Sequence, residues 1–281
     1  MVKKPYNVAI LKSSGETVDF SEEKLRSSLL HSGANHEQVQ AIIDKILPTI
    51  SPNLPTKAIY KMAFRLLKKD KPYFAAKYKL KKAIYELGPT GFPFEAFIAE
   101  IFKEEGYHTE VGIFVEGACV THEIDVVVTS ADEVFVVECK FHSEEGRPCD
   151  VKIPLYVRSR FEDVKKQWNR NASKKMLTQG WVATNTRFTA DAKNYALCAG
   201  LNLLSWDFPE GNALKHKIDK MALYPITVLT TLTQAEKQLI INERIVLCRQ
   251  LMENQGLLNK IGVSANRKER VLNELSFLCK H

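Results

Sequence analysis

The chain has 281 residues, of which 45% are apolar and 26% are charged, and its formal net charge is +7. This length suits two or three modules, and this composition excludes extended disorder. Because no apolar run is long enough to span a membrane and the first residues lack a signal-peptide core, the sequence predicts a soluble, cytoplasmic protein.

The charge is unevenly distributed along the chain. Residues 1–90 carry 16 Lys and Arg against 8 Asp and Glu, residues 91–220 carry 16 against 20, and residues 221–281 carry 8 against 5. The basic first segment predicts a partner that bears phosphate, whereas the acidic middle segment requires a different explanation. The six cysteines include no close pair, which favours reduced thiols over a zinc knuckle.

The first ninety residues predict a small hairpin followed by helices. The apolar strand "NVAILK", the turn "SSGE" and the strand "TVDF" form the hairpin. Ser21 is the expected N-cap of the first helix, with Lys24 at its third position, and two further helices fit residues 35–50 and 56–86. Pro72 divides the last of them. We expect this first domain to cover residues 1–88.

The order of these elements resembles a known nucleotide-binding module. The Lys-x-x-Gly turn, the short strand ending in Phe, and the segments "SEEKL", "LPTKAIYKM" and "AAKYKLKKAI" resemble the ATP-cone of ribonucleotide reductase large subunits over residues 5–86. The resemblance implies that ATP or dATP binds here as an effector. The residues it assigns are Lys12 and Lys24 at the phosphates, Val8 and Phe20 at the base, and Thr56 and Tyr60 near the pocket.

Basic residues dominate the end of this first segment. Within residues 57–82, ten Lys or Arg stand against one acid, Asp70. Two interpretations remain open for this run, a solvated helix face or a dock for nucleic acid. Taken without the pattern around them, Lys12 and Lys24 would be read as solvated surface charges.

Residues 91–220 predict a mixed sheet flanked by helices, of the α/β (α+β) class. The helix in "FEAFIAEIFKEEGY" has apolar residues at helical spacing and ends at Gly106. Strands follow at about 107–115, 119–129 and 133–141, and then come a helix through the basic stretch, a strand at "GWVATN", a helix at 189–199 and a strand at "LNLLSW".

Charged residues interrupt two of these apolar strands. In "HEIDVVV" and "VVECKF", alternation places Glu138 and Lys140 on one face of the sheet, and the neighbouring strand can bring Asp125 beside them. Two carboxylates in an apolar wall repel each other and resist ionising unless a cation neutralises them. Hard oxygen ligands favour Mg²⁺ or Mn²⁺ over zinc.

An acid, a gap of twelve residues and acid-x-Lys resemble the signature of PD-(D/E)xK nucleases, and "FEAF", "HEIDVVV", "VVECKF" and "VATNTRFTADAKNYALCAGLNLLSWD" resemble the Mrr-like restriction endonucleases over residues 92–208. The resemblance implies that Asp125, Glu138 and the carbonyl of Cys139 hold the metal and that Lys140 orients water or stabilises the transition state. It also implies that Glu95 supplies an acid on the far side of the metal.

The alternative interpretation of the same residues is structural. Glu138 and Lys140 could form a cross-strand pair on a solvent-facing sheet, but "VFVVECKF" lacks the polar alternation of such a face. His122 and Glu123 are interpreted as structural or supporting residues. Residues 151–176 contain eight Lys and Arg against Glu162 and Asp163, and this stretch is the expected resting place of a duplex backbone.

Residues 221–281 predict a helical domain. "QAEKQLIINERIVLCRQLM" has the spacing of one amphipathic helix, and "LLNKIGVSANRKERVLNEL" reads as a helix, a turn at Gly262 and a helix capped by Ser264. This last pair resembles a degenerate helix-hairpin-helix, a module that binds DNA phosphates. A packing or dimerisation role for these helices remains an alternative.

The sequence as a whole predicts a metal-dependent DNA endonuclease, tuned by adenine nucleotide and serving restriction of foreign DNA. No P-loop is present, so the nucleotide is expected to be an effector and not a fuel. The alternatives are a nucleotide-sensing DNA-binding regulator with an idle nuclease fold, and an RNA or repair nuclease. Because two cuts across a duplex need two sites, a homodimer or larger homo-oligomer is expected.

Overall fold

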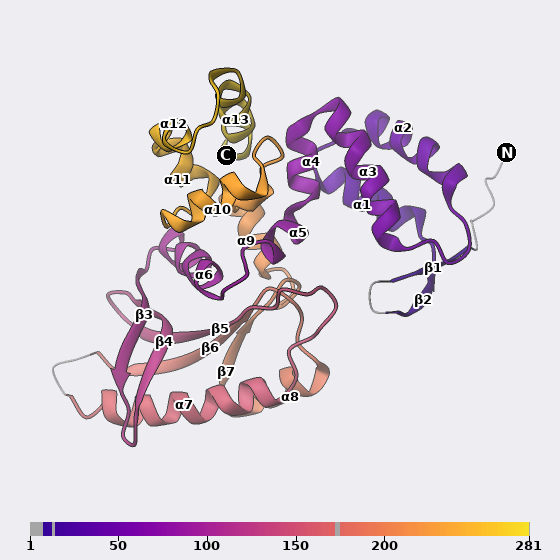
Figure 1. Cartoon of the computed structure of the whole chain (residues 1–281). Coiled ribbons are helices and arrows are strands. Elements are labelled where there is room, and N and C mark those ends of the chain that lie inside the picture. The colour runs from indigo at the N-terminus through magenta and orange to yellow at the C-terminus, as the bar shows by residue number, and fades with distance from the viewer. Residues whose placement is uncertain (1–7, 13–14, 172–174, 281) are drawn as a thin grey trace.

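The computed structural model contains a five-stranded mixed sheet, which lies below the N-terminal and C-terminal helices in the view of Figure 1. The structure describes residues 8–12, 15–171 and 175–280. The sheet order is β3-β4-β5-β6-β7, with β3, β4 and β5 antiparallel and β5, β6 and β7 parallel. The strands are β3 (His108–Glu116), β4 (Thr121–Thr129), β5 (Val134–Lys140), β6 (Leu177–Thr184) and β7 (Leu201–Leu204). The predicted α/β fold is therefore confirmed.

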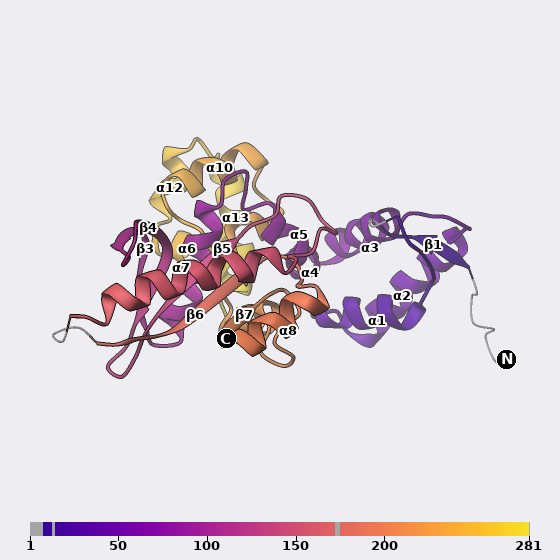
Figure 2. The ribbon, with the colours of Figure 1, turned by 90° about the horizontal axis from the view of Figure 1, so that it is seen from below.

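Helices cover both faces of this sheet (Figure 2). The helix α6 (Phe92–Glu104) packs on one face, and α7 (Lys152–Trp168) and α8 (Ala190–Ala199) pack on the other. Strand alternation sorts the side chains, because Val126 of β4 joins the core on the α6 side while Val127 joins the core on the α7 side. Both faces are thus buried, which explains why β4 and β5 are apolar along most of their length.

The N-terminal segment forms a two-stranded hairpin and a group of helices. Its elements are β1 (Ala9–Leu11), β2 (Thr17–Asp19), α1 (Glu22–His31), α2 (His36–Ile46), η1 (Leu47–Thr49), α3 (Thr56–Asp70), α4 (Pro72–Tyr78) and α5 (Leu80–Tyr85). Ser21 caps α1 by accepting a hydrogen bond from the amide of Lys24 at 3.2 Å, as predicted. The predicted helix over 56–86 is divided at Pro72 and again between α4 and α5.

The C-terminal segment is helical, and its elements are α9 (Leu214–Met221), η2 (Ile226–Val228), α10 (Gln234–Asn242), α11 (Cys248–Glu253), α12 (Gly256–Lys260) and α13 (Ala265–Leu278). The prediction of one helix over residues 234–252 is wrong. Arg244 has a left-handed φ of 61°, and Leu247 pairs with Pro225 in an isolated β-bridge, so the chain leaves the helix between α10 and α11. Ser264 is the N-cap residue of α13, but its side chain makes no capping hydrogen bond.

Two apolar cores organise the helices. Residues between Ile10 and Ala75 form a core of their own in the N-terminal segment. A larger core runs from Ala76 through α5, α6 and one face of the sheet to Leu278 of α13. This core includes residues on both sides of positions 88 and 220, the two domain boundaries expected from the sequence. Among the described residues, no helix is both long enough and apolar enough to cross a membrane.

Candidate active site

The first two candidate carboxylates lie side by side on neighbouring strands. Val126 of β4 pairs with Val137 of β5. Asp125, which precedes Val126, and Glu138, which follows Val137, are therefore neighbours on the two antiparallel strands. Oδ2 of Asp125 accepts a hydrogen bond of 2.6 Å from the amide of Cys139. Strand alternation puts Glu138 on the same side as Val134 and Val136, which pack against the α7 side of the sheet. Glu138 therefore faces α7, and Asp125 is held against the backbone of β5.

Arg160 of α7 engages this pair of strands directly. Its Nη1 lies 2.7 Å from both carboxylate oxygens of Glu138, and its Nη2 donates to the main-chain oxygen of Glu123. The Glu138 side chain is 22% exposed and that of Arg160 is 15% exposed, so this ion pair is largely shielded from water. Arg160 is therefore the one cation that contacts a candidate metal ligand among the described residues. Sequence reasoning counted it only as one of several basic residues in its stretch.

Burial and mutual repulsion raise the pKa values of the acid cluster, which consists of Glu95, Asp125 and Glu138. Burial, followed by the charge of Asp125, raises the pKa of Glu138 to about 7 even though Arg160 and Lys140 act in the opposite direction. Burial also raises the pKa of Asp125, against the hydrogen bond from the Cys139 amide and the charge of Arg160. At Glu138, burial and the neighbouring acid therefore outweigh the effect of the two nearby cations on the pKa.

Glu95 reaches the same cluster from the first turn of α6. Burial, and then the charges of Asp125, Glu123 and Glu138, raise the pKa of Glu95 to about 7. Its Oε1 lies close to Gly91, where an added Cβ would come within 3.0 Å of it. The charges of Asp125 and Glu138 thus act on the pKa of Glu95, and the role of this α6 acid at the metal stays a prediction.

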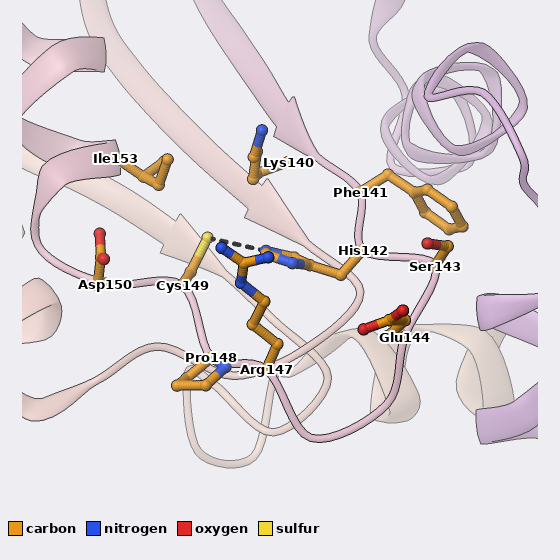
Figure 3. Close-up of a pocket in the computed structure, with 10 residues that line it drawn as sticks. All are labelled: Lys140, Phe141, His142, Ser143, Glu144, Arg147, Pro148, Cys149, Asp150 and Ile153. Atoms are coloured by element: carbon orange, nitrogen blue, oxygen red, sulfur yellow. Dashed lines mark hydrogen bonds between the residues drawn. The ribbon is translucent and has the colours of Figure 1, made fainter.

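Lys140 ends β5 at the mouth of a cavity of about 490 Å³ (Figure 3). The lysine side chain is exposed, and the loop between β5 and α7 forms the cavity wall. In that wall the Cys149 sulfur lies 3.7 Å from Nε2 of His142. Burial, together with Lys140 and Arg147, lowers the pKa of His142. This shift favours the neutral imidazole, which can accept as well as donate a hydrogen bond.

The position of His142 is fixed through its backbone by the neighbouring strand end. Asn185 accepts from the amide of His142 at 2.8 Å and donates to its carbonyl at 2.7 Å. Thr184 adds a hydrogen bond of 2.7 Å to the carbonyl of Lys140. Sequence reasoning missed His142 and Asn185 as neighbours of the site. The one available signal was their place just after the two parallel strands β5 and β6, whose ends meet at the same edge.

His122, which was interpreted as structural or supporting, bonds to α7. Its Nε2 lies 2.8 Å from Oδ2 of Asp163. Asp163 also accepts from the amides of Cys119 and Val120, and these contacts lower the pKa of Asp163 to about 2. The carboxylate thereby closes the turn between β3 and β4 and fixes the start of the strand that carries Asp125.

The basic stretch 151–176 lies mostly on α7. A cavity of about 690 Å³ runs beside this helix, and Arg160, Lys165 and Lys166 are among the residues that line it. Arg158 is paired with Glu162 at 2.7 Å and Lys175 with the carbonyl of Ser130 at 2.6 Å, whereas Lys152 and Lys166 are exposed. Lys174, which was counted in this stretch, lies outside the described residues.

The predicted nucleotide residues of the N-terminal segment do not share one cavity. Val8 and Phe20 are joined by a hairpin hydrogen bond of 2.8 Å, and Phe20 is buried. Lys12 pairs with Glu16 at 2.9 Å on the surface. Lys24 lines a cavity of about 760 Å³, whereas Tyr60 lines a different one of about 540 Å³. Thr56 is the first residue of α3, one helical turn before Tyr60.

The donor set at the strand ends fits a divalent cation in its chemistry. It consists of carboxylate and carbonyl oxygens, the ligands that Mg²⁺ and Mn²⁺ prefer. Burial first, and then the charges of neighbouring carboxylates, raise the pKa values of Glu95 and Glu138, and a bound cation would oppose both effects. Within the described residues, however, no three His, Cys, Asp or Glu side chains are gathered as a metal site. Asp125 and Glu138 instead bond to the Cys139 amide and to Arg160.

Comparison with known proteins places this site in a recognised domain. Residues 89–208 match the Mrr catalytic family model described as "Restriction endonuclease", and residues 224–279 match the model "AF1548-like, C-terminal". An uncharacterized protein of Archaeoglobus fulgidus is 34% identical over 178 residues, which cover 63% of this chain and 97% of that protein. This chain belongs to the AF1548-like family.

A solved structure agrees with this assignment. The crystal structure of the protein of unknown function AF1548 is 31% identical, covers 68% of this chain and 98% of its own, and aligns with a TM-score of 0.57. The structure of Can2 from Sulfobacillus thermosulfidooxidans in complex with cyclic tetra-adenylate aligns with a TM-score of 0.31 at 14% identity over 71% of this chain and 54% of that one. That likeness is too low to carry an inference.

These matches confirm the predicted restriction endonuclease domain. The predictions for the C-terminal helices and for the N-terminal segment have different outcomes. The C-terminal helices match the AF1548-like model, whereas the sequence resembled a helix-hairpin-helix. Neither family match extends into residues 1–88. The ATP-cone therefore stays a prediction.

Proposed function

We propose that this protein is a metal-dependent DNA endonuclease. The proposal is carried by one observation, the acid cluster beside Lys140 at the end of β5 within a restriction endonuclease domain. Asp125, Glu138 and the Cys139 carbonyl would hold Mg²⁺ or Mn²⁺, with Glu95 on the far side. When bound, the ion would lower the pKa of water and neutralise charge on the phosphate.

Basic residues of this chain would assist catalysis and contact the DNA. Lys140, an exposed point charge one residue beyond the Cys139 carbonyl, would orient the attacking water or stabilise the charge that grows on the phosphate. Arg160 holds Glu138 in place and, on release, would contact a DNA phosphate. The neighbouring Lys165 and Lys166 line the same α7 cavity and would position the duplex backbone.

Adenine nucleotide and self-association complete the proposal. ATP or dATP would bind the N-terminal segment and act through differential affinity for two arrangements of the protein. A homodimer or larger assembly would supply the second site that a double-strand cut needs. Restriction of foreign DNA is the process that such an enzyme would serve.

One observation favours a second candidate, a nucleotide-sensing DNA-binding regulator whose nuclease fold is idle. Arg160 already contacts both carboxylate oxygens of Glu138 at 2.7 Å, as it would in a domain that keeps its fold without binding metal. An RNA or repair nuclease would use the same acid cluster. Substrate and metal dependence separate these candidates.

The test is cleavage of plasmid, linear duplex, single-stranded DNA and RNA with Mg²⁺ or Mn²⁺, each with and without ATP or dATP. Asp125→Ala should abolish cleavage and leave nucleotide binding intact. Asp132→Ala is the matched control, because Asp132 lies in the turn that joins the same two strands. Cleavage that persists in Asp125→Ala would remove the proposed active site, and DNA binding without cleavage by the unmodified protein would support the regulator.

A further inference from the structure

A second charged cavity lies between the N-terminal helices and the C-terminal segment. It has a volume of about 540 Å³, within the range of small-molecule sites, and α3, α5, the segment after η2 and α10 enclose it. Among the described residues, six of the side chains that line it are basic and one is acidic, Glu86. The basic residues are Lys61, Arg65, Lys68, Lys79, Lys82 and Lys237.

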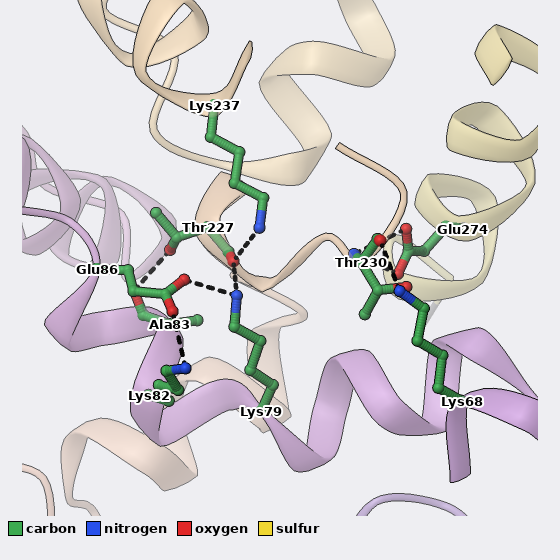
Figure 4. A network of polar contacts seen from close by, with 9 residues as sticks. All are labelled: Lys68, Lys79, Lys82, Ala83, Glu86, Thr227, Thr230, Lys237 and Glu274. Carbon is green, nitrogen blue, oxygen red and sulfur yellow. Dashed lines mark hydrogen bonds and ion pairs between the residues drawn. The ribbon is translucent and has the colours of Figure 1, made fainter. Parts of the chain in front are cut away.

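Two of these lysines are buried and share one acceptor (Figure 4). Lys79 is 9% exposed and Lys237 is 4% exposed. Each donates to the carbonyl oxygen of Thr227 at 3.0 Å, so two ammonium groups converge on a single neutral oxygen. Glu86 accepts from Lys79 at 2.6 Å and lies 3.6 Å from Lys82. We call Lys79, Lys82 and Lys237 the lysine cluster.

The nearby acids do not balance this charge. Glu86 is shared between Lys79 and Lys82. Glu274 of α13 is buried nearby, but its carboxylate accepts hydrogen bonds from Thr230 and Thr231. Burial lowers the pKa of Lys237, and the charge of Lys79 adds to this while Glu86 and Glu274 oppose it. A buried group of like charges costs free energy unless an opposite charge joins it.

The rest of the wall is aromatic and polar. Tyr60 and Phe64 of α3 line the cavity, and the Tyr60 ring stacks on Phe64 at 6.2 Å and on Tyr78 at 5.2 Å between ring centres. The Tyr60 hydroxyl is buried and has no hydrogen-bond partner within the described part of the chain. The Lys68 ammonium donates to the carbonyl of Thr230 at 3.1 Å and thereby joins α3 to the C-terminal segment.

We propose that this cavity binds a small anion that carries two or more phosphate groups. Lys79 and Lys237 form its floor, and the exposed Lys61, Arg65 and Lys82 lie at its rim. Point-charge ammonium groups suit phosphate oxygens. The recessed position of Lys79 and Lys237 favours a compact ligand over a duplex, whose backbone stays at the surface. A nucleoside triphosphate and inorganic tripolyphosphate share this chemistry.

The proposed site differs from the nucleotide site expected from the sequence. Of the six residues predicted there, only Tyr60 lines this cavity, while Lys24 lines another. The C-terminal segment, which the ATP-cone does not include, supplies Lys237 and Thr230. The proposal also stands independently of the nuclease function, because none of its residues belongs to the acid cluster.

Calorimetric titration of the full chain with tripolyphosphate, ATP and adenosine tests the proposal. We expect saturable binding of tripolyphosphate and ATP and none of adenosine. Lys237→Met should weaken both anions at least tenfold, and Arg65→Ala, a rim change that leaves the floor intact, should weaken them about threefold. Lys24→Ala is the matched control and should leave tripolyphosphate binding unchanged. Equal affinity for the two anions would identify phosphate as the whole ligand, and tighter ATP binding would add a contact to the nucleoside.

Three results would overturn it. One is the absence of saturable binding of either anion by the unmodified protein. Another is loss of binding in Lys24→Ala together with unchanged binding in Lys237→Met and Arg65→Ala, which would assign the anion to the other cavity. The last is weaker duplex binding in Arg65→Ala with unchanged tripolyphosphate binding, which would assign this surface to a DNA backbone.

Discussion

In both the acid cluster and the lysine cluster, burial and neighbouring like charges shift pKa values toward the uncharged form, upward for the acids and downward for the lysine. In the first, burial and neighbouring carboxylates raise the pKa values of Glu95 and Glu138; in the second, burial and a neighbouring ammonium lower the pKa of Lys237. Each cluster contains one partly compensating partner, Arg160 for the acids and Glu86 for the lysines. The comparison teaches that this protein keeps excess charge of both signs in shielded places, at a cost in stability that ligands of opposite charge would offset.

The largest expected effect is on the rate of DNA cleavage at the acid cluster. Lys140→Ala should lower the rate of DNA cleavage by about 100-fold to 1000-fold, because one charge aimed at the reacting phosphate is lost. Binding of Mg²⁺ should change little, since Lys140 supplies no metal ligand. The measurement is single-turnover cleavage at saturating metal, with Lys193→Ala on α8 as the control. Equal rates for the two variants would remove Lys140 from the proposed machinery.

The next effect tests whether Arg160 acts as a built-in cation for the acid cluster. Arg160→Ala leaves the shielded Glu138 carboxylate without its contacting cation, so the metal-free protein should lose about 2 kcal/mol of unfolding free energy. Mg²⁺ should then raise Tm more in the variant than in the unmodified protein. Thermal unfolding with and without Mg²⁺ measures both.

Arg158→Ala is the control for that experiment, because Arg158 forms an ion pair of the same helix with Glu162 and does not contact the acid cluster. If Mg²⁺ shifted Tm equally in the two arginine variants, Arg160 would be a packing residue and not a counter-charge.

A smaller effect of opposite sign is expected in the lysine cluster. Lys237→Met should stabilise the ligand-free protein by about 1 kcal/mol at neutral pH, because it removes a buried charge beside Lys79. The pKa of Lys237 is lowered to about 7, whereas an unfolded lysine titrates near 10. Between these pH values only the unfolded chain holds the proton, so stability of the unmodified protein rises with pH.

The advantage of Lys237→Met should therefore be greatest at or below pH 7 and should vanish near pH 10. Chemical denaturation at several pH values measures it, with Lys45→Met on an exposed position of α2 as the control. A variant less stable than the unmodified protein across this range would show that Lys237 is well compensated.

The smallest effect concerns Glu95. Its pKa is raised to about 7, above the value near 4.3 of an unfolded glutamate, so between these pH values the folded state holds a proton that the unfolded state has lost. Stability of the metal-free protein should fall as pH rises through this window. Glu95→Gln should remove the fall and gain less than about 1 kcal/mol at pH 8, because the group is partly exposed to solvent. Glu100→Gln on the same helix is the control, and a pH dependence identical in both variants would contradict the assignment.

The sequence predicted the central domain well because its signals are local. Strand alternation located Asp125, Glu138 and Lys140, and the apolar spacing in residues 94–102 located the helix that carries Glu95. Asn185 and Arg160 were not predicted as parts of this neighbourhood, because 43 residues separate Asn185 from His142 and 22 separate Arg160 from Glu138. Such contacts follow from strand order and helix direction, which periodicity does not encode.

The helical segments were predicted less well for a related reason. The apolar spacing over 234–252 is continuous, yet the chain turns at Arg244 because Leu247 pairs with Pro225 and Val246 accepts from the amide of Ile226. The lysine cluster was hidden for the same reason, since Lys79, between α4 and α5, and Lys237 of α10 are separated in the sequence by all the strands of the central sheet. Tertiary contacts outweighed the local helix preference between α10 and α11. Contacts between distant segments also formed the cavity that holds the lysine cluster.

Gly88 lies in the short segment between α5 and α6, where there is little room for a side chain. It lies between Glu86 and Glu95 along the chain, and a methyl group at its Cα would come within 2.8 Å of the Phe141 ring, next to Lys140. A side chain here would require the Phe141 ring, which packs against Phe94 at 5.8 Å between centres, to shift. Position 88 can therefore gain a side chain only if the residue at position 141 moves or becomes smaller, so substitutions at these two positions should occur together in evolution.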